Sequence, residues 1–190
     1  MKGMTSLQQK IQEKRLLYRV LNKKDPEAYA NLYDLYVEKI YRFVLFKVSS
    51  REEAEDITSD IFLKVWKYLI QKEGKDIESI SGLLYRTARN AIIDHYRQRA
   101  KKQTCSIEGV EDTLSDNEQG RKVIELRQDA DALLLAVRLL KQEYQEVILL
   151  RYIDEMSIAE IAAILGKKRT NIRVTLHRAT KKLQEIFTQT

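Results

Sequence analysis

The sequence contains few of the residues that interrupt helices or cross-link a chain. Its 190 residues include one proline, Pro26, six glycines and one cysteine, Cys105. So few turn-forming residues argue against a many-stranded sheet, and we expect helices instead. One cysteine cannot form an internal disulfide or a pair of thiolate metal ligands. The sequence also shows no nucleophile motif and no Gly-rich phosphate loop, so we expect no metal, no other cofactor and no enzyme.

Long apolar runs are also absent. No stretch approaches the roughly 20 apolar residues of a membrane span, and residues 1–14 carry charges where a secretory signal would be apolar. We therefore expect a cytoplasmic protein without membrane insertion. The 34 Lys and Arg exceed the 28 Asp and Glu by six, which is compatible with a polyanionic partner but too little to establish one.

Apolar residues at three- and four-residue steps predict an all-α protein. A short helix around residues 16–21 is expected to precede three helices with buried stripes. These stripes are Leu32, Leu35, Tyr36, Ile40, Phe43 and Val44; Ile57, Ile61, Val65 and Leu69, with Phe62 and Trp66 beside them; and Leu84, Ala88, Ile92 and Tyr96.

A segment of different character divides the chain into two small helical domains. Residues 106–120 contain five acids and no basic residue, with few large apolar groups, so they cannot bury enough surface to offset their ordering entropy. We predict a flexible acidic linker at 103–120. An N-terminal extension and leading helix occupy 1–24, and the two domains occupy 25–102 and 121–190. The second domain begins with helices at 123–140 and around Val147, Ile148 and Arg151.

The second domain ends in the pattern of a helix-turn-helix. Ser157 and Glu160 have the spacing of a capping box, and Gly166 is suited to end that helix. A helix at 169–187 follows, and residues 166–182 carry seven Lys or Arg and no acid. Its core side is predicted to hold Ile172, Leu176, Ala179, Leu183 and Ile186, with Thr170, Val174, His177, Arg178 and Lys181 opposite.

This basic helix has the features of a DNA recognition helix. Side chains near its start must reach base edges, and later cations must contact phosphates. Arg173, Val174, His177 and Arg178 are placed for the bases, and Lys181 and Lys182 for the phosphates. The competing interpretation is a solvated basic face that complements the helix C-terminus.

A second basic helix is predicted at 83–102, with six basic residues and one acid. Arg86, Asn90, Arg97 and Lys101 share the face opposite its apolar stripe. Asn can hydrogen-bond a base edge, and Arg can stack on an exposed base or bind phosphate. Two basic surfaces joined by a linker favour bipartite DNA binding, although such a helix is often merely exposed.

An acidic stripe, which we define as residues 51–60, precedes Phe62 and Trp66. It contains five acids and one base. Acids in a first helical turn ordinarily complement the helix dipole, but a DNA-binding protein with such a patch can also present it to a basic protein surface.

Three segments together resemble the extracytoplasmic-function sigma factors of the sigma-70 family. The helix that binds polymerase is similar to EDITSDIFLKVWK at 55–67. The helix for the minus-ten element is similar to LYRTARNAIIDHYR at 84–97, and the minus-thirty-five helix-turn-helix to SIAEIAAILGKKRTNIRVTLHRATKKL at 157–183. DPEAYANLYDLY from Asp25 extends the likeness, and the order and spacing also agree.

The resemblance implies a transcription initiation factor that guides RNA polymerase to particular promoters. Its implied partners are promoter DNA and core RNA polymerase, through the clamp helices of the largest subunit and the flap of the second largest; an anti-sigma factor is a further candidate. The implied polymerase-binding residues are Glu55, Asp56, Ser59 and Asp60. The implied minus-ten residues are Arg86, Asn90, Asp94, Arg97 and Lys101, and the minus-thirty-five residues are Arg169, Thr170, Arg173, Val174, His177, Arg178 and Lys181.

Two functions other than that of a sigma factor are alternatives for this sequence. A stand-alone helix-turn-helix regulator would bind duplex DNA unaided, and its sensor domain would need neither the basic face at 86–101 nor the acidic stripe. A helical adaptor without a nucleic-acid role leaves both basic faces unexplained.

Overall fold

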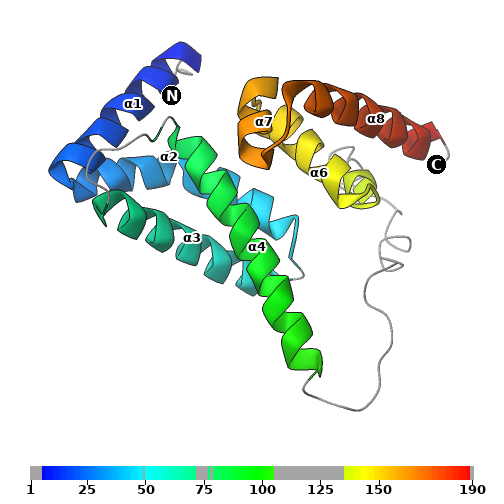
Figure 1. The fold of residues 1–190 in the computed structure, drawn as a ribbon, viewed down its shortest axis with the longest axis horizontal. Coiled ribbons are helices and arrows are strands. Elements are labelled where there is room, and N and C mark those ends of the chain that lie inside the picture. The colour runs from blue at the N-terminus through cyan, green and yellow to red at the C-terminus, as the bar shows by residue number, and fades with distance from the viewer. Residues whose placement is uncertain (1–5, 49, 72–76, 78, 105–134, 189–190) are drawn as a thin grey trace. The chain divides into compact units, whose positions relative to one another are not determined.

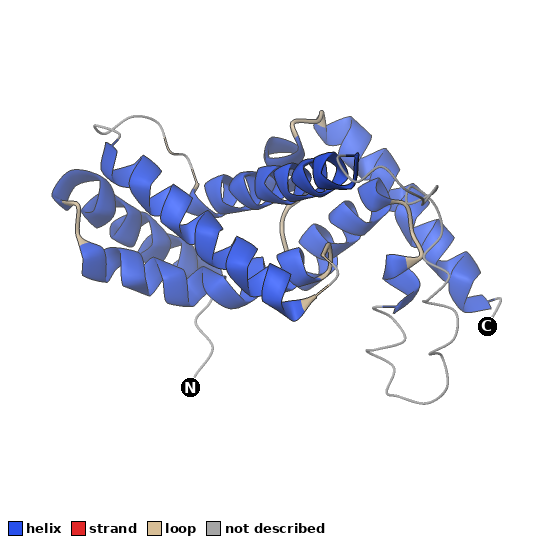
Figure 2. Cartoon of the chain, turned by 90° about the horizontal axis from the view of Figure 1, so that it is seen from below, coloured by secondary structure: helices blue, strands red, loops and turns tan. Residues whose placement is uncertain are grey.

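The structure, a computed structural model, describes residues 6–48, 50–71, 77, 79–104 and 135–188. Within these ranges it has helices and connecting loops and no strand (Figure 2). The prediction of an all-α fold is therefore confirmed. The chain separates into two compact units, Met1–Lys102 and Gln103–Thr190. In the described part, no helix has the length and apolar character needed to cross a membrane.

The first unit contains four long helices, labelled in Figure 1. Helix α2 packs against both α1 and α3, and α1 also contacts α3. An edge-to-face contact between Phe43 and Tyr85, with ring centroids 5.3 Å apart, joins α2 to α4. The bounds are α1 Ser6–Lys23, α2 Pro26–Leu45, α3 Arg51–Gln71 and α4 Ile80–Thr104.

The predicted apolar stripes form the core of this unit, with three exceptions. Leu35 on α2 and Trp66 on α3 are only half-buried. Tyr96 was predicted to continue the α4 stripe, and this is wrong because its side chain is 44% exposed. It lies one turn beyond Ile92, the last buried residue described on α4, and its hydroxyl donates a hydrogen bond to the Lys47 carbonyl instead.

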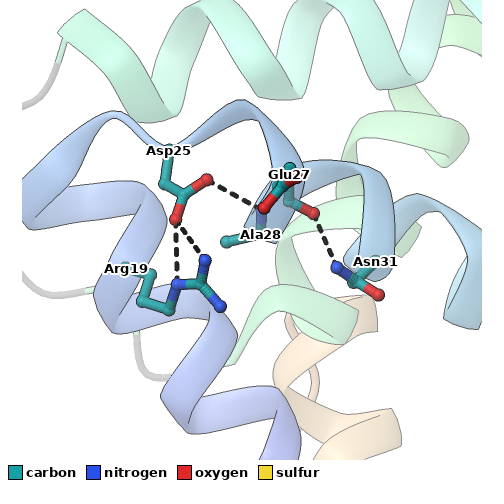
Figure 3. Close-up of polar contacts among 5 residues, drawn as sticks. All are labelled: Arg19, Asp25, Glu27, Ala28 and Asn31. Carbon is teal, nitrogen blue, oxygen red and sulfur yellow. Dashed lines mark hydrogen bonds and ion pairs between the residues drawn. The ribbon is translucent and has the colours of Figure 1, made fainter.

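A charged corner fixes the turn from α1 into α2 (Figure 3). Asp25 is the N-cap of α2, and its Oδ1 accepts a hydrogen bond from the Ala28 amide at 3.1 Å. Its Oδ2 lies 2.8 Å from Nε and 2.6 Å from Nη2 of Arg19. The Ala28 hydrogen bond, reinforced by the charge and hydrogen bond of Arg19, holds the pKa of Asp25 below its ordinary value.

The second unit is built from shorter helices. Residues 135–138 are helical, followed by α6 Gln142–Ile148, which runs directly into a π-helix, η2 Leu149–Ile153. Helices α7 Ile158–Leu165 and α8 Arg169–Thr188 complete it. Helix α8 packs on α6 and α7, around a core that includes Val147, Leu150, Ile161, Ile172 and Ala179.

Several predicted boundaries differ from the structure. The short helix predicted around residues 16–21 is the longer α1, Ser6–Lys23, and the helix predicted from residue 83 begins at Ile80. Helix α4 continues to Thr104, two residues into the predicted linker, and residues 105–120 lie outside the described ranges. The helix predicted at 123–140 is described only from residue 135, and its regular part ends at residue 138.

The Asp25 corner generates a prediction about the stability of the first unit. Asp25→Asn retains a capping side chain but loses the ion pair, whereas Asp25→Ala loses both. We expect the melting temperature at neutral pH to fall in the order wild type, Asn, Ala. The fluorescence of Trp66, the one tryptophan of the chain, reports this unit.

The sign of the pH dependence follows from the lowered pKa. A carboxyl with a lowered folded pKa stabilises the fold above its unfolded pKa and loses that effect as the pH falls through the folded pKa. The gap between wild type and Asp25→Asn should therefore close on acidification. Asp34→Asn, at an exposed acid of α2, is the matched control, and an equal effect there would contradict a role specific to Asp25.

Candidate functional site

Helix α3 presents most of the acidic stripe to solvent. The Ser50 hydroxyl accepts a hydrogen bond from the Glu53 amide at 3.1 Å, near the start of the helix. Ala54, Ile57, Thr58 and Ile61 are buried on its inner face. This register leaves exposed the four residues predicted to bind polymerase, Glu55, Asp56, Ser59 and Asp60.

An apolar groove lies between α2 and α3, next to the stripe. It encloses about 440 Å³ and is lined by Pro26, Tyr29, Tyr33, Ser59, Phe62, Leu63 and Trp66. Rings from the two helices form its wall, with centroids 4.9 Å apart for Tyr29 and Trp66. The Tyr29 hydroxyl donates a 2.5 Å hydrogen bond to the Phe62 carbonyl, and burial raises the pKa of this phenol.

The sequence interpretation missed the share of α2 in this groove. Tyr29 and Tyr33 are four residues apart, and this spacing is a signal for a second apolar face beside the buried stripe. Tyr33 is 40% and Leu63 is 56% exposed. An apolar side chain from a partner can therefore be buried here, beside the acids of α3.

Helix α4 carries the predicted minus-ten residues on its outer face. Arg86, Asn90, Asp94 and Arg97 are all exposed, opposite the buried Leu84, Ala88 and Ile92. Arg97 approaches Asp94 at 3.9 Å in a solvent-exposed pair, which restrains the guanidinium only weakly. Lys101 lies on the same helix, but its side chain is outside the described part.

The helix-turn-helix is positioned by local hydrogen bonds. The Glu160 amide donates to Ser157 Oγ at 3.3 Å, and the Ser157 amide donates to Glu160 Oε2 at 2.8 Å. The predicted capping box is therefore confirmed. Gly166 ends α7 in the left-handed region with φ 64° and ψ 32°, as predicted.

Helix α8 separates a core side from a basic side. Ile172 and Ala179 are fully buried, and Leu176, Leu183 and Ile186 are half-buried on the same side, which confirms the predicted inner face. The other face exposes all seven predicted minus-thirty-five residues, namely Arg169, Thr170, Arg173, Val174, His177, Arg178 and Lys181.

The cations around α8 differ in their partners. Lys167, in the turn before the helix, pairs with Glu143 of α6, and Lys182 pairs with Glu185 at 3.0 Å. Among the described residues, no acid pairs with Arg173, Arg178 or Lys181. Their charges therefore face solvent and can neutralise a polyanion.

The described side chains offer charge and apolar contact area. Within this part of the chain, no group of three His, Cys, Asp or Glu side chains is placed to hold a metal ion. His177 is exposed on α8, and His95 lies 3.6 Å from Glu53. The arrangement suits binding to a basic protein surface and to nucleic acid.

Two family models match the chain in this order. The model described as Sigma-70 region 2 matches residues 32–102, and the model described as Sigma-70, region 4 matches residues 130–183. The first range contains the acidic stripe, most of α4 and the groove residues from Tyr33 onward, while Pro26 and Tyr29 precede it. The second contains the helix-turn-helix.

Curated proteins show similarity over most of this chain. It is 30% identical to the ECF RNA polymerase sigma factor BldN of Streptomyces coelicolor over 86% of the chain, although it spans only 61% of that protein. It is also 30% identical to the RNA polymerase sigma factor YlaC of Bacillus subtilis, covering 87% of this chain and 95% of YlaC.

A solved structure shares the fold. The sigma factor RpoE of Bartonella quintana, crystallised with the anti-sigma factor NepR, superposes with a TM-score of 0.65. The match covers 84% of this chain and 96% of that one, at 21% identity.

The left-handed turn at Gly166 gives a prediction for the helix-turn-helix. Gly166→Ala should destabilise the second unit by about 1–2 kcal/mol, because a Cβ disfavours this backbone conformation even in open space. Gly166→Asn should cost less. Amide hydrogen exchange across α7 and α8 measures the loss.

Gly82→Ala is the control for this substitution. A Cβ at Gly82 would lie 3.7 Å from Ser79 in ordinary contact, so the exchange of α4 should be unchanged or slower. If Gly166→Ala left α7 and α8 equally protected, the left-handed turn would not be a constraint on this unit.

Proposed function

Because the chain belongs to the extracytoplasmic-function sigma factors of the sigma-70 family, we propose that it binds core RNA polymerase and directs it to particular promoters. The observation that carries this proposal is the presence of both sigma regions in one chain, in the family's order. A stand-alone helix-turn-helix regulator would account for the second match and leave the first unexplained.

The two units are assigned separate tasks in this proposal. Residues 25–102 form the region 2 domain, which binds polymerase and the minus-ten element. Residues 121–190 form the region 4 domain, which binds the minus-thirty-five element and the flap of the second-largest polymerase subunit. The extension and leading helix at 1–24 precede them, and the linker at 103–120 joins them.

The polymerase contact is assigned to the outer face of α3. Glu55, Asp56, Ser59 and Asp60 meet the clamp helices of the largest subunit in this proposal. Their exposure and negative charge support it, since complementary charges steer association and select partners. The adjoining groove supplies apolar area that a charged stripe alone would lack.

The minus-ten contact is assigned to α4. Arg86, Asn90, Asp94, Arg97 and Lys101 face the minus-ten strand in this proposal. The first four of these residues are exposed on one side of α4, whose other side is buried, and this arrangement supports the proposal. Arg and Asn can stack on and hydrogen-bond to unpaired bases.

The minus-thirty-five contact is assigned to α8. Arg173, Val174, His177 and Arg178 reach base edges in the major groove, and Arg169, Thr170 and Lys181 contact the backbone. The support is the exposed basic face, with three cations that have no acidic partner among the described residues.

Regulation and location follow from the same proposal. The chain acts in the cytoplasm, where its template lies, without membrane insertion, and it contributes binding rather than a chemical step of its own. An anti-sigma factor that covers these surfaces is a fitting regulator, because the related RpoE was crystallised with one.

Charge reversal on α3 tests the polymerase contact. Asp56→Arg should weaken binding to core polymerase on the order of tenfold or more, because it places like charge against a basic surface. Stability should change within about 0.5 kcal/mol, since the side chain is exposed. Fluorescence titration of labelled chain with core polymerase gives the affinity.

Asp34→Arg makes the same charge change at an exposed position of α2, outside the stripe. It should retain wild-type affinity. Equal affinities for the two variants would move the polymerase interface away from this face of α3.

Truncation on α8 tests the DNA contact. Arg178→Ala should weaken binding to the minus-thirty-five duplex while the unit stays folded, because Ala179 and Ile172 hold the helix from its other side. A bidentate guanine contact predicts a loss of about 1–3 kcal/mol at one base position. A phosphate contact predicts a uniform loss and a salt dependence shallower by about one unit of slope.

Lys141→Ala is the matched control, because this exposed cation of the same unit lies outside the predicted DNA-contact residues. Its effect on affinity should be the smaller of the two. Binding curves at several salt concentrations distinguish these results, and an Arg178→Ala variant with unchanged affinity, specificity and salt slope would remove this face from the DNA interface.

A further inference from the structure

One acid of the stripe is turned toward a neighbouring helix. Glu53 is half-buried, unlike Glu52, Glu55 and Asp56 around it. Its Oε1 lies 3.6 Å from Nε2 of His95 and 3.7 Å from Nη1 of Arg99, both on α4. The carboxylate of Glu53 therefore links the start of α3 to the second half of α4.

That half of α4 is less deeply packed than the first half. After Ile92, none of the described side chains of α4 is buried, and Figure 1 shows the last turns of the helix extending past α3. Apolar packing therefore holds the first half of α4, and polar contacts must restrain the second half. Asp94, Arg97 and Lys101, three of the proposed minus-ten residues, lie on this second half.

A second contact joins the same part of α4 to the segment that leads into α3. The Tyr96 hydroxyl donates a hydrogen bond to the Lys47 carbonyl, in the segment that leads into α3, and the Tyr96 ring packs edge-to-face on His95 with centroids 5.6 Å apart. Burial raises the pKa of Tyr96, and the charge of Glu53 raises it further. These groups thus form one interacting cluster.

We propose that Glu53 is a positioning residue, which fixes the DNA-binding half of α4 relative to the polymerase-binding helix α3. This inference rests on the proposed function of those two helices. Glu53 is suited to the role because its own backbone is held at the Ser50 cap. The half-exposed ion pair between Glu53 and Arg99 contributes little alone, but the His95 ring and the Tyr96 hydrogen bond lie at the same junction.

Glu53 thereby has a function distinct from that of its neighbours in the stripe. Asp56 acts on the partner directly, whereas Glu53 acts through the orientation of α4. A merely structural role would alter folding or polymerase affinity as much as it alters strand binding. A positioning role alters strand binding alone.

The test compares Glu53→Gln with Glu52→Gln in the full-length chain. Glu52 is an exposed acid in the same turn and has no ion-pair partner among the described residues, so Glu52→Gln controls for the charge lost. Each variant is assembled with core polymerase and titrated with a single-stranded minus-ten oligonucleotide, and permanganate reactivity on duplex promoter reports strand opening.

We expect Glu53→Gln to keep its affinity for core polymerase within about twofold and to lose strand affinity on the order of fivefold, the scale of a small network of half-exposed ion pairs. Glu52→Gln removes the same charge from the stripe, so it should change polymerase affinity no less than Glu53→Gln does and should keep wild-type strand affinity. The double variant Glu53→Arg with Arg99→Glu should recover part of the strand affinity lost by Glu53→Arg alone. Unchanged strand affinity in Glu53→Gln, or equal losses in polymerase and strand affinity, would overturn the proposal.

Amide hydrogen exchange of the free protein separates failure of this inference from failure of the proposed function. Glu53→Gln should raise exchange over residues 94–100 and leave residues 84–92 unchanged. If the wild-type chain bound neither polymerase nor DNA, the proposed function would fail, and the exchange would still decide whether Glu53 anchors α4. Equal exchange in wild type and variant would contradict the anchor whatever the chain binds.

Discussion

The burial of one apolar stripe per helix is the interaction on which the rest of the structure depends. The described residues have no sheet to align the helices, so the inner face alone sets which side chains point outward. Ile57 and Ile61 on α3 leave Asp56 and Asp60 in solvent, and Ile172 and Ala179 do the same for the basic face of α8. Each proposed binding surface is therefore the exposed face opposite a buried apolar face. The sequence of each such helix must satisfy both core packing and binding.

Beyond the end of the buried apolar face of α4, polar and charged contacts restrain the helix. Helix α4 is packed through Ile92 and is held beyond it by the cluster of Glu53, His95, Tyr96 and Arg99. Because ion pairs of this kind are weak and screened by salt, their hold on this half of α4 should weaken as the salt concentration rises.

The features predictable from the sequence are local or periodic. The capping box at Ser157, the turn at Gly166 and the inner face of α8 each depend on residues within a few positions of one another. The missed features depend on distant residues or on backbone detail. Tyr96 has the right spacing for the core but stays 44% exposed. Glu53 contacts His95 and Arg99, more than 40 residues away, and Tyr29 of α2 meets Trp66 of α3. The π-helix after Ile148 follows from no rule of spacing.

We propose above all that this chain confers promoter selectivity on RNA polymerase. The most direct measurement is transcription from a library of promoter fragments by purified core polymerase, with and without the purified chain. We expect transcripts that require both the chain and the polymerase and that start downstream of minus-thirty-five and minus-ten elements with a shared spacing. Transcripts independent of the chain, or DNA selection by the chain that polymerase leaves unchanged and that yields no initiation, would contradict it.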